Sequence, residues 1–289
     1  IQPDRRCQVE QVGNGLHQLV CGLAKAVLLS GQFYLIIQQM QAASKEHNTF
    51  FFSWLYQLLF FLYVYFQITG YTDMARGIAA CYGYALPKSS RLPLWNKQLS
   101  VFLQNWNRTV LRWFSRAFSS PKQTAASLWL QMLFTYSVLS WFCRGTLTGF
   151  LGGLLIGVIL AWFEDVQRKW KFPTAIHWFL SIICSVFAWS LFCSDTLTEA
   201  VQTWGNLLGL SKDAVSYQDL YFLQSSLLLL LIAGFCTSGW HRSIQKWLKK
   251  RTLTAWIPTI IVPVGDVLFL GLSVLAMASN AIPPLFFRW

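Results

Sequence analysis

Residues 50–69 of the chain read FFFSWLYQLLFFLYVYFQIT, a run without a single charged side chain. A helix needs roughly 17–25 predominantly apolar residues to cross a bilayer, so this stretch predicts a transmembrane helix. By the same criterion, further spans are expected at residues 16–40, 126–143, 145–163, 175–194, 219–240 and 258–279. The sequence therefore predicts an all-α polytopic membrane protein with about seven transmembrane helices.

The composition supports this interpretation. Of the 289 residues, 55% are hydrophobic and only 12% are charged, and the mean hydropathy is +0.43. A water-soluble domain could not cover so much apolar side chain with polar surface. The net charge of +12 is typical of a membrane chain that contacts anionic lipid. Membrane lipids are therefore expected partners, and nucleic acid is not.

Lysine and arginine are concentrated in three of the predicted loops, 72–123, 164–172 and 241–251, whereas loops 41–49 and 195–218 carry few. Basic loops remain on the cytoplasmic side of a membrane. The alternation of seven spans places all three basic loops on one side, so we expect that side to be the cytoplasm.

Two segments have amphipathic patterns. Residues 71–123 combine apolar side chains at helical spacing with arginines, glycines and prolines, which predicts a re-entrant or interfacial helical segment on the cytoplasmic side of a single membrane domain over residues 1–289. A second amphipathic helix is expected to end near Leu208, with Glu199 in its first turn and either Asp195 or Thr196 as N-cap.

The cysteines and histidines give no sign of a metal site. The seven cysteines lack the paired spacing of a zinc site or a disulfide framework, so we expect small buried hydrophobes and no bound metal. Interfacial or structural roles are expected for the four histidines, His17, His47, His177 and His241. The chain lacks an initiator methionine and a signal peptide, and it is expected to be the later part of a longer one.

Charged groups at membrane depth are functional candidates because they are expensive to bury. Asp73 is either such a group or the partner of Arg76, three residues further along a helical turn. Asp266 is either a polar anchor or part of a site lining. Arg144 either caps helix carbonyls and reaches toward the interface or binds an anionic carrier, a phosphate or a lipid headgroup.

Aromatic and thiol side chains near these positions allow further alternatives. Trp106 and Trp141 either face lipid or line a tunnel for a sugar or an acyl group. Cys143 could carry an acyl thioester, but a thiol within an apolar span is usually inert.

Five stretches, taken in order, resemble the membrane-bound O-acyltransferase superfamily, and within it the bacterial branch that O-acetylates alginate and other exported polysaccharides. Residues 21–28 (CGLAKAVL) are similar to the motif GLAKKVL, residues 70–75 (GYTDMA) to GYSDMA, residues 102–107 (FLQNWN) to FWRRWH, residues 189–197 (WSLFCSDTL) to WVFFRADTL, and residues 280–289 (NAIPPLFFRW) to NPFIYFRF. The resemblance implies a funnel of tilted helices and the absence of N-terminal spans common in that branch. It also implies a bacterial cytoplasmic membrane or its equivalent.

The catalytic pair departs from the pattern. The family's histidine lies in a WHG motif on a hairpin, where this chain has WFCRG at residues 141–145, so Arg144 or Cys143 takes its place. Asn107 stands at the second catalytic position and is an acceptable substitute there. Acyl transfer to a hydroxyl needs a group that accepts a proton, and a guanidinium in a protein does not lose its own. Arg144 therefore cannot be the general base.

The sequence predicts a catalytically degenerate subunit that docks or conducts an acyl group or ligand together with a partner protein for acyl transfer or polysaccharide modification. The alternative is an active O-acetyltransferase that uses Asn107 and an unrecognised base. No bound cofactor is expected, and the resemblance alone implies acetyl-CoA or an acyl carrier as donor. A transporter has no supporting string of buried acidic residues.

Overall fold

The structure is a computed structural model that describes residues 9–43, 49–86, 113, 116, 125–169, 174–211, 215–238 and 256–279. Every regular element within these residues is a helix, so the all-α class is confirmed. The chain divides into two compact units. Unit 1 comprises residues 1–41, 59–88 and 224–282, and unit 2 comprises residues 42–58, 89–223 and 283–289.

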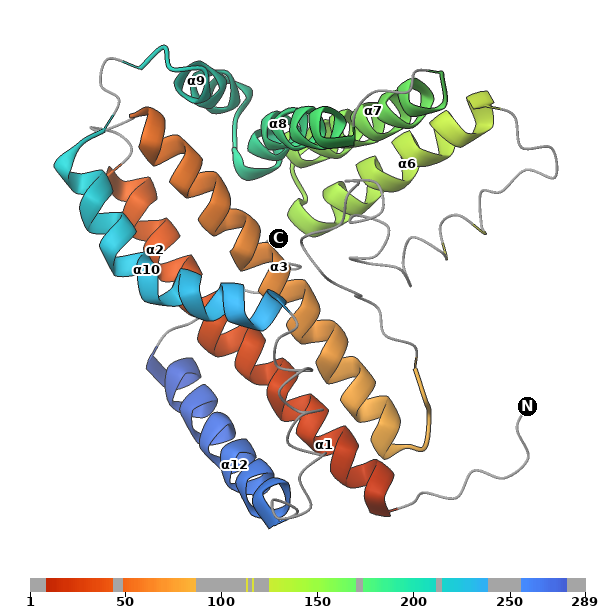
Figure 1. Ribbon diagram of the computed structural model, residues 1–289, viewed down its shortest axis with the longest axis vertical. Helices are drawn as coiled ribbons and strands as arrows, with labels where there is room; N and C mark the ends of the chain where they lie inside the picture. Colours follow the sequence, from red (N-terminus) through yellow and green to blue (C-terminus); the bar gives the residue numbers. More distant parts are fainter. Residues whose placement is uncertain are drawn as a thin grey trace. The chain divides into compact units, whose positions relative to one another are not determined.

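A long helical hairpin forms the centre of unit 1 (Figure 1). Its first arm is α1 (Val9–Ala24), a π-helical segment η1 (Lys25–Leu29) and α2 (Ser30–Ala43), which follow one another without a break. Its second arm is α3 (Phe50–Cys81), whose residues from 59 onward belong to unit 1. The fully buried Phe33 and Phe66 stack between the arms with ring centroids 6.2 Å apart. Beside them, the buried hydroxyl of Ser30 donates to Gln67 Oε1 at 2.6 Å.

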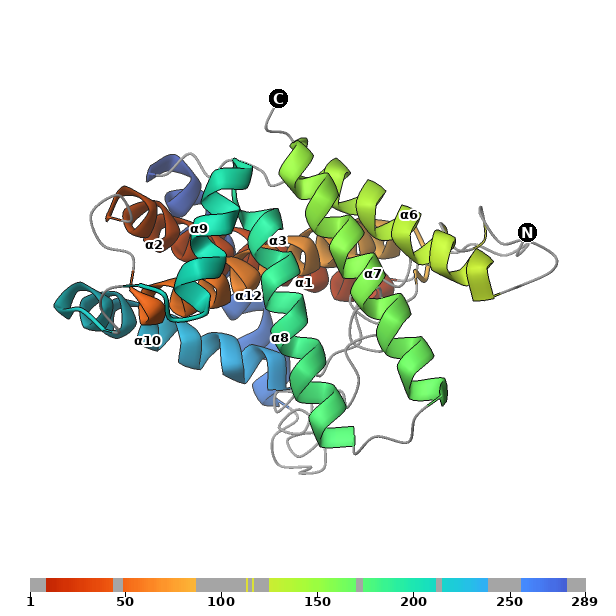
Figure 2. The same ribbon diagram turned by 90° about the horizontal axis from the view of Figure 1, so that it is seen from above.

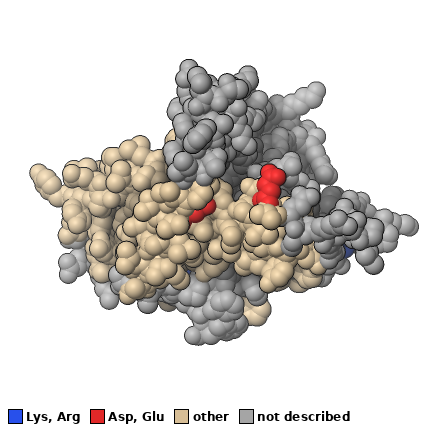
Figure 3. Space-filling view, turned by 90° about the horizontal axis from the view of Figure 1, so that it is seen from below, with Lys and Arg blue, Asp and Glu red and all other residues tan. Residues whose placement is uncertain are grey.

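Two further helices contribute to unit 1, α10 (Tyr217–Ser238, from residue 224 onward) and α12 (Trp256–Ser279). In Figure 1, α12 lies beside α1, against which it packs. Both helices expose large apolar side chains: Leu228 is 67% exposed on α10, and Val267 is 71% exposed on α12. On the face drawn in Figure 3, uncharged residues dominate the described surface, interrupted by isolated acidic side chains. Such a surface is suited to lipid rather than to water.

Unit 2 contains α6 (Ala125–Arg144), α7 (Leu147–Lys169), α8 (Thr174–Cys193) and α9 (Leu197–Leu207). The central helix is α7, which lies between α6 and α8 (Figure 2). Its glycines allow this close packing, because a Cβ on Gly153 would meet the carbonyl of Tyr136 on α6, and one on Gly152 would lie 2.9 Å from the amide nitrogen of Phe192 on α8. Small residues at helix contacts are the usual means by which apolar helices approach closely.

The predicted amphipathic helix after residue 195 is confirmed as α9. Of the two candidate N-caps, the structure selects Thr196, whose hydroxyl accepts from the backbone N–H of Glu199 in a capping box. The apolar side of α9 is fixed by Trp204, whose Nε1 donates to Ser190 Oγ at 2.6 Å. Asp195 therefore lies just before the helix, at the corner between α8 and α9.

Among the residues that the structure describes, three helices are long and apolar enough to cross a membrane, Val9–Ala43, Phe50–Cys81 and Tyr217–Thr237. Shorter apolar helices lie within the other four predicted spans, at Met132–Trp141, Leu147–Trp162, Ile182–Cys193 and Val262–Ala278. The membrane-protein class agrees with these helices. The number of seven spans, the funnel and the single domain over residues 1–289 remain predictions.

The span predicted at residues 50–69 continues as helix to Cys81. The first eleven residues of the segment predicted at 71–123 are thus part of α3, and helix persists through Asp73 and Arg76 because both charges have partners. Beyond residue 86, the structure describes only Trp113 and Arg116 of that segment.

Candidate functional site

The motif stretches at residues 21–28 and 70–75 pack against each other in unit 1, although they are far apart in the sequence. A Cβ on Gly22 would lie 2.6 Å from the amide nitrogen of Met74, and a Cβ on Gly70 would lie 2.8 Å from the Cβ of Ala26. Gly15, seven residues before Gly22, and Gly77, seven residues after Gly70, make the same kind of contact with each other. The seven-residue spacing of these glycines on each helix allows the backbones of α1 and α3 to approach, which brings the polar residues of the two motifs together.

Asp73 is the centre of the first polar cluster. Its carboxylate accepts from Lys25 Nζ at 2.7 Å, from Arg76 Nη1 at 3.3 Å and from Gln18 Nε2 at 3.4 Å. The ion pair with Arg76 was one of the two roles predicted for Asp73, whereas the pair with Lys25 was not predicted. Two cations on one carboxylate leave a net positive charge in a partly buried place, since the side chains of Asp73 and Arg76 are 23% and 17% exposed.

Lys25 also marks a change in the helix. It is the first residue of the π-helical segment η1, which separates α1 from α2. Single turns of π-helix are frequent at functional sites because the extra residue redirects the side chains that follow. Here the change occurs at the residue that pairs with Asp73.

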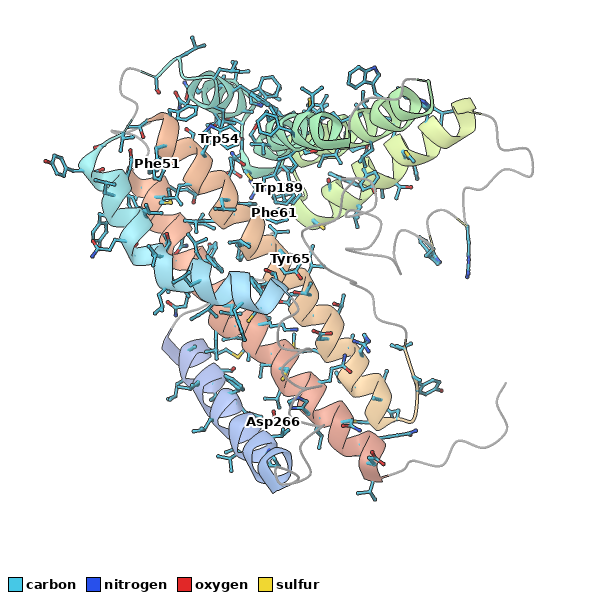
Figure 4. The ribbon with its side chains drawn as sticks, viewed as in Figure 1. Phe51, Trp54, Phe61, Tyr65, Trp189 and Asp266 are labelled. Atoms are coloured by element: carbon cyan, nitrogen blue, oxygen red, sulfur yellow. The ribbon has the colours of Figure 1, made fainter. Side chains whose placement is uncertain are left out.

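A second polar cluster lies on the same helix. His17 and Cys21 are spaced four residues apart on one face of α1, and Lys25 follows four residues later as the first residue of η1. His17 Nδ1 lies 2.8 Å from Asp266 Oδ1 and 3.0 Å from Asp266 Oδ2, and Cys21 Sγ lies 3.8 Å from His17 Nε2. Figure 4 labels Asp266 on α12, at the side of that helix which faces α1. Asp266 therefore anchors α12 to α1, and its imidazole and thiol neighbours form a group of potential metal ligands.

The hairpin between α6 and α7 in unit 2 carries Arg144. Gly145 makes the turn with a φ of +68°, a conformation that favours glycine. Arg144 Nη2 donates to the backbone carbonyl of Cys193 at 3.0 Å and to Asp195 Oδ1 at 2.7 Å. Of the two roles predicted for Arg144, the structure thus shows the capping of a helix carbonyl, at the last residue of α8.

The other predicted site residues have different environments. Cys143 is a free thiol that is only 7% exposed, which favours an inert side chain over an acyl carrier. Trp141 is 56% exposed, and its proposed role in lining a tunnel stays a prediction. Asn107 and Trp106 lie outside the described residues, as does the predicted proximity of Asn107 to Arg144.

Sequence reasoning missed Lys25 and the group of His17, Cys21 and Asp266. The four-residue spacing along α1 was a usable signal for Lys25 and for two members of that group. Asp266 lies 249 residues away from His17, and no local pattern in the sequence could pair them.

Comparison with known proteins gives two relatives. The peptidoglycan O-acetyltransferase of Helicobacter pylori is 22% identical over 168 residues, which cover 55% of this chain and 32% of the relative. The probable alginate O-acetylase AlgI of Pseudomonas syringae is 19% identical over 241 residues, which cover 81% of this chain and 46% of the relative. No family model matches the chain, and no solved structure matches it significantly.

The chain spans about a third to a half of the length of these relatives. Both relatives are O-acetyltransferases of the membrane-bound type. Their similarity to this chain confirms the resemblance to membrane-bound O-acyltransferases that its motifs predicted.

Proposed function

We propose that the chain is a membrane-bound O-acyltransferase relative that has lost its proton-accepting histidine and docks or conducts an acyl group or ligand for an active partner. Its location would be a bacterial cytoplasmic membrane, with loops 72–123, 164–172 and 241–251 on the cytoplasmic side. The polysaccharide substrates of the two relatives suggest that the partner modifies an exported polysaccharide.

The observation that carries this proposal is the engagement of Arg144. A residue at a catalytic centre must present its reactive group to the substrate, but the Arg144 guanidinium is bonded to Asp195 and to the Cys193 carbonyl, and its side chain is only 11% exposed. The position where the motif comparison expects an imidazole thus holds a group that connects the α6–α7 hairpin to the α8–α9 corner. Its present role in this structure is to hold two turns together.

Cys193 supports the same interpretation. In the motif that resembles residues 189–197, an arginine stands where this chain has Cys193. The cationic group beside Asp195 in this structure comes from Arg144 instead. A positive charge beside Asp195 is thereby present while the hairpin lacks an imidazole, as expected of a chain that has kept the architecture and lost the chemistry.

One observation favours the alternative, an active transferase with a displaced base. The carboxylate of Asp266 holds the imidazole of His17 at 2.8 Å, and a carboxylate that orients a histidine is a common feature of general-base sites. The alternative would require acceptor hydroxyls to reach this imidazole, whose side chain is 41% exposed.

Acyl transfer can be tested with the purified chain in lipid vesicles. The assay measures the release of free coenzyme A from acetyl-CoA in the presence of alginate or peptidoglycan fragments. We expect no turnover above protein-free vesicles, and no change in Asn107→Ala or Arg144→Ala. Turnover that survives both substitutions and disappears in His17→Ala would refute the degenerate-site proposal and identify the displaced base.

The docking role needs a separate measurement. Arg144→Ala, reconstituted with the membrane fraction of the source cell, should recruit less acyl-transfer partner than the natural chain if the hairpin forms the docking surface. Arg76→Ala is a matched control, because it removes an arginine ion pair from unit 1. Equal recruitment by all three proteins would contradict a docking role for the hairpin.

A further inference from the structure

The group formed by His17, Cys21 and Asp266 in unit 1 has the donor atoms of a metal site. The imidazole nitrogen, the thiol sulfur and a carboxylate oxygen all lie within 4.8 Å of one another. Two donors come from one face of α1 and the third from α12, so the geometry depends on the packing of two helices. All three residues are partly buried, which leaves a route for an ion to enter.

The distances are close to those that a tetrahedral ion requires. Zinc binds sulfur at about 2.3 Å and nitrogen or oxygen at about 2.0 Å, which separates tetrahedral sulfur and nitrogen donors by about 3.5 Å and nitrogen and oxygen donors by about 3.3 Å. Cys21 Sγ is 3.9 Å from His17 Nδ1, and that nitrogen is 2.8 Å from Asp266 Oδ1. Shifts of about half an ångström in opposite directions would bring these two pairs to the tetrahedral separations, and the third pair, Cys21 Sγ and the Asp266 carboxylate, lies within 4.8 Å.

We propose that His17 Nδ1, Cys21 Sγ and Asp266 bind a divalent transition-metal ion of the zinc class, with one coordination position left open. A thiolate, a neutral imidazole and a carboxylate carry two negative charges, so a divalent ion makes the site neutral. Neutrality matters in a predicted span, because an uncompensated charge at membrane depth is expensive. Binding displaces the thiol proton to solvent.

The charges nearby do not compete for the same ligands. Lys25, one turn after Cys21, is paired with Asp73 at 2.7 Å.

A nucleophilic Cys–His–Asp arrangement fits the geometry less well. In such a triad the thiol lies in line with Nε2, on the far side of the ring from the nitrogen that faces the carboxylate. Cys21 Sγ is instead almost equidistant from the two ring nitrogens, at 3.8 Å from Nε2 and 3.9 Å from Nδ1. A metal ion bound through Nδ1 is compatible with these positions, because Asp266 and Cys21 both lie within reach of that nitrogen.

Cobalt(II) provides a direct test, since a thiolate ligand produces a charge-transfer band in the near ultraviolet. The full chain, purified without a polyhistidine tag and treated with a chelator, is titrated with Co²⁺ in detergent. We expect one ion per chain and a thiolate band in the natural protein. Cys21→Ser should lose the band, and His17→Ala and Asp266→Asn should each weaken binding by about tenfold or more, since even the loss of a group that only orients a metal ligand costs about 10–100-fold.

Cys236→Ser is the matched control, because Cys236 is also a partly buried free thiol in an apolar helix. This variant should keep the band and the affinity. Zinc should also raise the unfolding temperature of the natural protein and of Cys236→Ser, but not that of Cys21→Ser, because an ion that binds only the folded site stabilises the folded state.

The proposal is overturned if the folded natural chain gives no thiolate band, or if the band persists in Cys21→Ser. A cooperative thermal unfolding transition of each variant without metal shows that a loss of binding is not a loss of fold. The metal site does not depend on the proposed function, because neither readout involves acyl transfer.

Discussion

The contact between Arg144 and Asp195 can be measured by a double-mutant cycle of Arg144→Met and Asp195→Asn. Methionine keeps most of the length and apolar contact of arginine but removes its charge and donors. Asparagine keeps the shape of Asp195 and also its backbone N–H, which donates to Glu199 Oε2 at 3.1 Å. The two substitutions therefore remove the ion pair and leave the α9 cap in place.

The expected magnitudes follow from exposure. Asp195 is 61% exposed, and exposed ion pairs contribute about 0.2–1 kcal/mol. The bond from Arg144 to the Cys193 carbonyl is charge-assisted, and such bonds contribute about 1.5–3 kcal/mol. We therefore expect Arg144→Met to lower the free energy of unfolding by about 2–3 kcal/mol, Asp195→Asn by about 0.5 kcal/mol, and the coupling energy to be about 0.5–1 kcal/mol.

Reversible unfolding in mixed detergent micelles measures these terms. Raising the ionic strength should shrink the coupling energy, since the Debye length falls from about 10 Å at 0.1 M salt to about 3 Å at 1 M. The difference between Arg144→Met and the natural chain should persist, because the carbonyl bond is partly buried. Additive effects of the two substitutions would show that the contact does not form in solution, and the main support for a structural Arg144 would then be lost.

Two other predictions test the packing and the topology. Gly22→Ala should destabilise unit 1 relative to Gly13→Ala by about 1–3 kcal/mol, the usual effect of overpacking. A Cβ would lie 2.6 Å from the backbone at Gly22, whereas it would meet nothing within 4 Å at Gly13. Both substitutions gain the same helix propensity, so equal stabilities of the two variants would contradict the α1–α3 contact. Cysteines placed at Lys169 and Lys249 in an otherwise unreactive background should resist an impermeant thiol reagent from outside the cell, and labelling of either would refute cytoplasmic loops.

The helices were predictable from the sequence because apolar runs of sufficient length leave few alternatives. The amphipathic helix α9 was predictable for another reason, since Thr196 and Glu199 form a local capping pair whose spacing the sequence shows. The end of α3 was not predictable. Asp73 and Arg76 resemble the start of a loop until Lys25 is known to lie 2.7 Å from Asp73, and that contact joins residues 48 positions apart.

The candidate sites divide in the same way. The importance of positions 73 and 144 could be predicted, because each lies in a stretch with a charged residue where apolar ones are expected. Their distant partners could not, because Lys25 and Asp195 are brought to Asp73 and Arg144 by helix packing. A sequence pattern identifies a group that needs a partner, and the tertiary structure decides which partner it receives.

Two of the stretches that carry the family resemblance meet in unit 1, and a third meets the hairpin that departs from the family pattern in unit 2. Residues 21–28 pack on residues 70–75 through Gly22 and Gly70, and the hairpin of residues 141–145 reaches residues 189–197 through Arg144. Each pair stabilises a contact between helices, so the similarity in these stretches is sufficiently explained by the need to keep the architecture. A fold can persist after its chemistry is lost. Similarity to O-acetyltransferases therefore supports an acyltransferase architecture for this chain, while activity has to be decided at Asn107, Arg144 and His17.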